Sequence, residues 1–263
     1  MLVPTDIVPG RLLSRHGRTR TPRLLGAIRS LLPWMATKPK IALDLHEHGI
    51  VAYHAASRKS VFVSFMAMAD LCLYRTDHRL FGPANALAFR RDPGDAWIDV
   101  LDGDGDGVRL RGEIIGGQLR ERGPLALRSL EAGEVLTFHA ISDADRLAAR
   151  AQGAAAFGKT TELQLSRIGL DVDGQRIAIE EIAKLDEGGP DGSLRLFDAH
   201  GYMLWSVHTL SLFSADLFVV LMRTMIEAHQ YGLPQKNRPP EIHTRAADTG
   251  GAGDVTGRED GES

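Results

Sequence analysis

The chain has 263 residues, which is long enough for one large domain or two small ones with hydrophobic cores. Its net charge is −3, but basic side chains gather in residues 1–40, so acids are in excess over the rest of the chain. An acidic body repels phosphate, which argues against nucleic-acid binding. The single cysteine, Cys72, has no partner for an internal disulfide, and no apolar run is long enough to span a bilayer. We therefore expect a cytoplasmic protein.

Residues 1–37 form a basic arm that is predicted to be disordered or to form an amphipathic helix. Apolar residues recur at helical spacing from Leu24 to Leu32, which favours a helix lying on anionic lipid. The scarcity of acids is also typical of an organelle targeting peptide, and a leader that is not part of the folded protein is the third interpretation. Four arginines of this arm are candidate contacts for lipid or another anion: Arg18, Arg20, Arg23 and Arg29.

Residues 38–133 are predicted to form a strand-rich unit. The segment "LDLHEHGI" at 43–50 predicts two strands joined at a glycine turn, and "ALAFRR" and "AWIDVL" predict further strands. Arg58 and Lys59, in "SRKS", could form a small phosphate-contacting loop. His46 and His48, with His54, have a spacing that could hold a metal, but turn positions without a ligand role are the favoured interpretation.

Residues 102–113, "DGDGDGVRLRGE", match the ligand pattern of a calcium-binding loop. Asp102, Asp104, Asp106 and Glu113 occupy ligand positions. Such a loop needs a helix on each side, whereas "AWIDVL" and "VRLRGEII" both look like strands. We interpret the segment as a β-hairpin turn, because Asp-Gly pairs supply the positive φ values that these turns require. No metal site is expected, and whether this turn binds calcium weakly stays open.

Residues 134–160 are predicted to connect two repeats through an alanine-rich helix and a loop. Ser142 is the expected N-cap of the helix. The loop "GAAAFGKT" at 153–160 fits the phosphate-loop pattern letter for letter. A phosphate loop follows a strand and opens a helix, whereas the predicted order here is helix, loop, strand. We therefore expect no nucleotide site, with Lys159 at the entrance of a strand.

Residues 161–232 repeat the pattern of the first unit. "LQLSRIGL" at 163–170 matches "LDLHEHGI", and "VDGQ" and "DAHG" are turn signals of an antiparallel sheet. "SADLFVVLMRTMIEAHQ" predicts a closing helix with Ser214 as N-cap, and its wide apolar stripe could also pack on the other repeat or on a partner. Residues 233–263 are predicted to be a disordered tail. Four apolar positions recur with the same gaps: Val63, Phe65, Met68 and Leu71, then Ile177, Ile179, Ile182 and Leu185.

The repeated pattern resembles that of uncharacterised bacterial proteins with two pleckstrin-homology-like repeats. The resemblance is carried by residues 43–50, residues 163–185 and "GPLALRSLEAGEVLTF", and it covers roughly residues 38 to 232. It implies an α+β fold of two tandem β-sandwich repeats, 38–133 and 161–232, each closed by a C-terminal helix. Because the shared motifs are packing patterns, the resemblance indicates a fold rather than an activity.

The function expected from the sequence is that of a non-catalytic binding or scaffold module. Exposed strand edges can pair with a partner protein without any signature residue. The alternative is a peripheral binder of anionic membrane lipids through the basic arm, at the inner face of the membrane. The sequence has no nucleophile elbow and no evident nucleophile, histidine and acid set, so neither enzymatic activity nor a cofactor is expected. The identity of the partner and the oligomeric state stay open.

Overall fold

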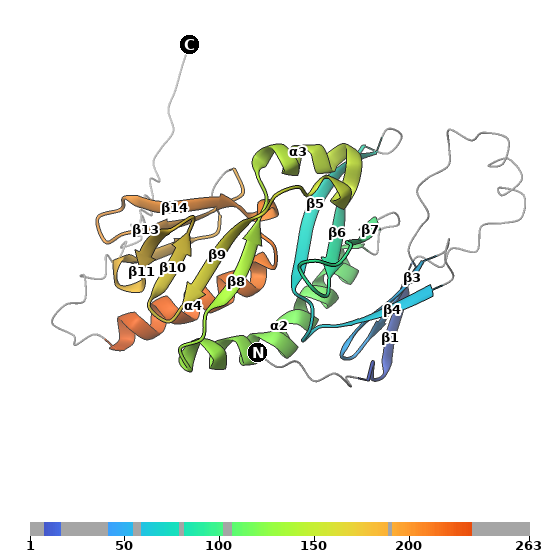
Figure 1. Ribbon diagram of the computed structural model, residues 1–263, viewed down its shortest axis with the longest axis horizontal. Helices are drawn as coiled ribbons and strands as arrows, with labels where there is room; N and C mark the ends of the chain where they lie inside the picture. The colour runs from blue at the N-terminus through green and yellow to red at the C-terminus, as the bar shows by residue number, and fades with distance from the viewer. Residues whose placement is uncertain are drawn as a thin grey trace, which may run out of the picture.

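The computed structural model describes residues 8–16, 42–54, 59–78, 82–101, 107–188 and 191–232. Over these residues the chain is an α+β protein with four small antiparallel sheets and three α-helices (Figure 1). None of the helices in these ranges has the length and apolar character needed to cross a membrane. The predicted α+β class with antiparallel pairing is confirmed. The arm residues 1–7 and 17–41 and the tail 233–263 lie outside the described residues.

The same order of elements occurs twice along the chain: a four-stranded sheet, a three-stranded sheet and a helix. The first repeat comprises β1 (Leu12–His16), β2 (Ala42–His46), β3 (Gly49–His54), β4 (Lys59–Ser64), β5 (Asp70–His78), β6 (Gly82–Arg90), β7 (Ile98–Leu101) and α2 (Gly107–Glu131). The second comprises β8 (Leu136–Ala140), β9 (Thr161–Ser166), β10 (Gly169–Val172), β11 (Gln175–Ala178), β12 (Lys184–Asp186), β13 (Ser193–Phe197), β14 (Met203–His208) and α4 (Ala215–Gly232).

Each repeat encloses a hydrophobic core between its two sheets and its helix. In the first repeat, Leu43 and Val63 of one sheet and Phe89 of the other belong to the same buried cluster. In the second, Leu163 and Leu196 pack with the buried face of α4. The alternation of apolar and polar residues along the strands produces these faces, because successive side chains of a strand point to opposite sides. The four recurring apolar positions of each repeat all pack in its core or against it.

Two of the turns that the sequence predicts are present, one in each repeat. In the first repeat, residues 47–48 join β2 to β3, and the register pairs His46 with Gly49. In the second, Val172 pairs with Gln175, and the two residues between them, Asp173 and Gly174, both have positive φ. Positive φ at both central residues defines a type I′ hairpin turn, as "VDGQ" predicts.

Helix α2 corrects the prediction of a strand in "VRLRGEII". Gly107–Glu131 is a continuous helix of 25 residues, so Glu113 lies within it and there is no hairpin here. Leu110 and Ile114 are buried, four residues apart, which is the spacing of one helix face. Asp102, Asp104 and Asp106 lie outside the described residues.

Helix α2 also serves both repeats, a role that the expectation of one closing helix for each sandwich did not include. Its first half contributes Leu110 and Ile114 to the core of the first repeat. Its second half contributes Ala126 and Leu130 to the core of the second, beside α4. The wide apolar stripe of α4 thus packs partly on the first repeat's helix. Because one continuous helix lies in both cores, the repeats are held in a fixed relative position.

Two boundaries also differ from the prediction. Leu12–His16, placed in the arm, is β1 and pairs with β2, while Leu136–Ala140, placed in the connecting segment, is β8 and pairs with β9. The insertion between β8 and β9 consists of α3 (Asp143–Gln152) and the short 3₁₀ helix η2 (Gly153–Ala156). Ser142 caps α3 as predicted, its hydroxyl accepting from the N–H of Asp145. The insertion therefore leaves the pairing of β8 with β9 intact.

Candidate functional site

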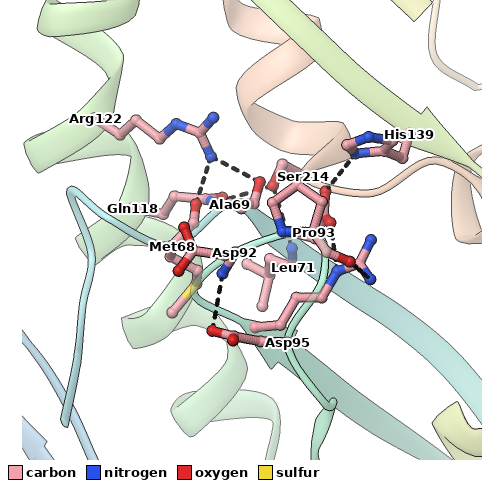
Figure 2. Close-up of polar contacts among 12 residues, drawn as sticks. Met68, Ala69, Leu71, Asp92, Pro93, Asp95, Gln118, Arg122, His139 and Ser214 are labelled. Atoms are coloured by element: carbon pink, nitrogen blue, oxygen red, sulfur yellow. Dashed lines mark hydrogen bonds and ion pairs between the residues drawn. The ribbon is translucent and has the colours of Figure 1, made fainter. Parts of the chain in front are cut away.

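The repeats meet at a buried polar cluster, which we call the junction (Figure 2). It joins strands of both repeats to α2 and to the residue before α4. The junction consists of six side chains: Asp70, Arg90, Gln118, Arg122, His139 and Ser214.

Asp70 is the centre of the junction. It begins β5 and pairs in the sheet with Arg90, the last residue of β6. The Nε of Arg90 donates to Oδ2 of Asp70 at 2.6 Å, and the Nδ1 of His139, on β8, lies 3.0 Å from Oδ1. The side chains of Asp70 and His139 are only 3% and 10% exposed. The guanidinium of Arg90 also lies 4.5 Å from the ring centre of Trp97, a cation–π contact.

Helix α2 supplies the other half of the junction. Arg122 donates to the carbonyl oxygens of Met68 and Ala69, the latter at 2.8 Å. The side-chain amide of Gln118 donates to the hydroxyl of Ser214 at 2.9 Å, and the N–H of Leu71 donates to the same oxygen at 3.3 Å. Ser214 has a positive φ of 51° and uses its hydroxyl for these contacts, not for the N-cap role that the sequence predicts.

The electrostatics of the junction depend on Asp70. Burial raises the pKa of Asp70, but the hydrogen bond and charge of His139 and the charge of Arg90 outweigh it, so the net pKa lies below the ordinary value of 3.8. Burial lowers the pKa of Arg122, and the negative charge of Asp70 opposes that shift. Both groups are charged at neutral pH. The buried carboxylate therefore neutralises arginines from β6 and α2 at once.

The junction does not assemble a nucleophile with a base. His139 is bonded to Asp70, as a histidine is in a catalytic set, but the hydroxyl of Ser214 is bonded to Gln118 and Leu71 and not to His139. Cys72, two residues after Asp70 on β5, is fully buried, and burial raises the pKa of its thiol, which keeps it protonated. The arrangement is suited to holding two repeats together.

Acid should weaken the protein through the junction. Because the pKa of Asp70 is lowered on folding, its carboxylate stabilises the fold fully above 3.8, and this contribution is lost as pH falls through the lower folded value. We expect the difference in free energy of unfolding between the natural chain and Asp70→Asn to shrink as pH drops below 3.8. Urea titrations at several pH values measure it, and a difference that stays constant into acid would contradict this account.

The loop that resembles a phosphate loop fastens the insertion to the first repeat. Asp99 of β7 accepts hydrogen bonds from the N–H of Ala154, at 3.1 Å, and from the hydroxyl of Tyr74. Phe157 packs edge-on against Tyr74 and Trp97, with ring centres 5.6 and 5.1 Å apart. The predicted order of helix, loop and strand is confirmed, since α3 precedes the loop and β9 follows it. Lys159 is exposed at the entrance of β9.

Gly153→Ala should destabilise the protein through this loop. Gly153 has φ of 72°, and a Cβ there would lie within 3.0 Å of the carboxylate of Asp99. We expect a loss of about 2 kcal/mol in the free energy of unfolding, because backbone strain and displacement of Asp99 add together. Lys159→Ala, at an exposed position of the same loop, should leave the melting temperature unchanged. Equal melting temperatures for the two variants would refute the fastening role.

The other candidate residues do not converge on a site. His46 contacts the carbonyl oxygen of Gly10, and His48 lies 3.1 Å from Glu121 of α2. No group of three or more potential ligands is found in the described ranges that could hold a metal. Lys59 begins β4. Five of the predicted anion contacts lie outside the described residues: Arg18, Arg20, Arg23, Arg29 and Arg58.

No family model matches the chain, and no curated protein matches it significantly.

Proposed function

We propose that the chain is a non-catalytic binding module of two pleckstrin-homology-like repeats, and that it adds an extended segment of a protein partner to the free edge of β14. The repeated order of four-stranded sheet, three-stranded sheet and helix supports the repeat assignment. The junction supports a non-catalytic role, because its acid, histidine and serine are engaged in joining the repeats. A cytoplasmic location remains part of this proposal.

The edge of β14 is the observation that carries the proposal. β14 borders its sheet, pairing with β13 on one side, and no described strand pairs with its other side (Figure 1). Its six residues, "MLWSVH", include no acid, lysine, arginine or proline. Burial, and then the charge of Arg146, lowers the pKa of His208, so this histidine is neutral at pH 7. Tyr202 and Met203 at its start are 72% and 57% exposed. Natural proteins usually block such an edge.

The backbone groups at the centre of β14 face outward. The N–H of Thr209 donates to the carbonyl oxygen of Gly192 at 3.0 Å, and Leu194 pairs with Val207. Residues of an antiparallel strand alternate between bonded and non-bonded positions. Thr209 and Val207 therefore bond to β13, while the N–H and C=O of Ser206 and His208 point to the free edge. An added strand can pair with these groups.

Most of the other sheet borders in the described ranges are charged, short or covered, which favours β14 as the docking edge. β5 is covered by Ser214, whose N–H donates to the carbonyl oxygen of Leu71, and β8 by residues 211–213. The borders with a charged residue, a short length or a covering loop are β1 with Arg15, β7 under η2 through Asp99, β11 with Arg176, and β12 with Lys184. β4 is the remaining open border.

Ser206→Pro tests strand addition directly. Proline removes the outward N–H, and it is tolerated on edge strands where that group faces solvent. A photo-reactive amino acid at Met203 should form adducts with a partner in cells, and Ser206→Pro should abolish them. Ser206→Ala, which keeps the N–H, should leave them unchanged. The same probe at Val108, an exposed residue at the start of α2, serves as a surface control. Adducts that persist in Ser206→Pro, or that match those from Val108, would refute the proposal.

Lipid binding is the alternative function that the sequence predicts. It depends on the basic arm, most of which lies outside the described residues, and nothing in the described sheets adds to it. Flotation with anionic vesicles at low and high salt tests it separately, because headgroup attraction weakens with ionic strength.

A further inference from the structure

We propose that one occupant of the β14 edge is a second copy of this chain, paired antiparallel about a two-fold axis that passes beside Ser206. This inference rests on the proposed function, because it uses the same free edge. It adds the identity of an occupant and a way to regulate the module, since a copy bound at β14 excludes any other strand. The two sheets would then form one continuous six-stranded sheet across the axis.

The register of β14 makes the strand self-complementary. With the axis at Ser206, this residue faces its own copy, and His208 faces Leu204 of the copy. The outward N–H and C=O of Ser206 can then bond to the same groups of its copy, as in an antiparallel bonded pair. A register centred on Trp205 would overlap as many residues, 203–207, but it would place the irregular stretch of β14 between Met203 and Trp205 wholly inside the pairing, whereas the register at Ser206 leaves Met203 outside it. A two-fold pairing also closes on itself, so it produces a dimer and not a filament.

Two arginines beside β14 are paired with acids of the same copy, and Arg75 of β5 also acts on His208 at the end of the strand. Arg195, opposite Ser206 on β13, forms an ion pair with Asp191 at 2.8 Å. Arg146 of α3, near His208, forms another with Asp143 at 3.0 Å. β14 itself brings no charge at neutral pH. A foreign strand that binds through complementary charge would need a net charge along β14. A second copy brings the same charges, so it can approach only where the strand is neutral at the axis.

The pairing is expected to be weak and concentration-dependent. One strand edge with the exposed side chains of Tyr202 and Met203 forms a small interface, well below that of an obligate dimer. We expect the chain to sediment as a monomer at about 3 µM and to contain a substantial dimer fraction at about 300 µM. Such an equilibrium leaves the edge open to a partner at low concentration.

A charge-swap experiment tests both the edge and the axis. Ser206→Lys places two like charges opposite each other in the dimer, and so does Ser206→Glu. Each variant alone should sediment as a monomer at a concentration where the natural chain dimerises. An equal mixture of the two should regain the dimer, because lysine then faces glutamate across the axis. Both variants keep the backbone N–H, and unchanged melting temperatures would verify that they fold.

Each outcome bears on the proposal. A natural chain that stays monomeric throughout overturns it, and so does a dimer that neither single substitution weakens. A dimer weakened by both substitutions but not restored in the mixture overturns the axis at Ser206. The proposed function is judged independently: a foreign adduct at Met203 that is lost in Ser206→Pro, from a monomeric chain, would keep strand addition and remove self-pairing. If the only adduct were one with a second copy, self-pairing would be kept and addition of a foreign strand would be refuted.

Discussion

Replacing Asp70 by alanine should lower the free energy of unfolding by about 3–5 kcal/mol. The carboxylate is the shared counter-charge of Arg90 and a hydrogen-bond partner of His139, and its charge also acts on Arg122. Its removal leaves buried guanidinium charge without an acid, and the cost of that unpaired charge exceeds the net contribution of the ion pair itself. The loss should affect both repeats together, because the junction joins β5, β6 and β8 to α2.

The measurement is thermal and urea unfolding of the full chain. Asp70→Ala should reduce the melting temperature by about 10 °C for a chain of this size. Asp92→Ala is the matched control, because Asp92 also accepts from an arginine, Arg91 at 2.9 Å, but both side chains are largely exposed. Exposed pairs contribute little, so this control should leave the melting temperature unchanged. Similar losses of stability in the two variants would mean that burial does not determine how much the Asp70 contacts stabilise the fold.

The strands could be predicted from the sequence because their signal is local. Alternating apolar residues at 43–50 and 163–170, and the four apolar positions that recur with the same gaps, mark faces that pack in the observed cores. The two-residue turn at "VDGQ" also follows from its own residues, since Asp and Gly tolerate positive φ. Patterns of this kind need no knowledge of distant contacts.

Helix α2 could not be predicted from the sequence, because its composition is unfavourable for a helix. Gly112, Gly116, Gly117 and Gly123 lie inside it together with Pro124, and glycine and proline are the weakest helix formers. Packing compensates at Gly117, where a Cβ would meet the ring of Phe65 within 3.0 Å. Tertiary contact with both cores therefore stabilises a helix whose local sequence does not favour it.

The junction could not be predicted, because its members are far apart in the chain. Asp70 and His139 are 69 positions apart, and Gln118 and Ser214 are 96 apart. Each is a single polar residue within an apolar segment, and one sequence does not reveal which of them pair. The charge of Asp70 inside the run "VFVSFMAMADLCLY" was the available signal, since an acid in a buried strand needs a buried partner.

Gly169→Ala should lower the free energy of unfolding by about 3 kcal/mol. A Cβ there would lie within 3.0 Å of the carbonyl oxygen of Ile177, on the neighbouring strand β11. A backbone carbonyl in a paired strand cannot rotate away, so the pairing of β10 with β11 must shift. Gly49 occupies the matching position of the first repeat, against the carbonyl oxygen of Val63, and Gly49→Ala should cost a similar amount.

Gly112→Ala provides the control for both substitutions. Gly112 lies in α2, and no atom within 4 Å would meet its Cβ. Alanine is the better helix former, so this variant should be unchanged or more stable by up to about 1 kcal/mol. Urea unfolding of the three variants decides the matter. If Gly49→Ala and Gly169→Ala were as stable as Gly112→Ala, close backbone approach would not explain why this glycine recurs. The glycine that follows the "leucine, any, leucine" pattern in both repeats would then have no structural explanation in the β-hairpin.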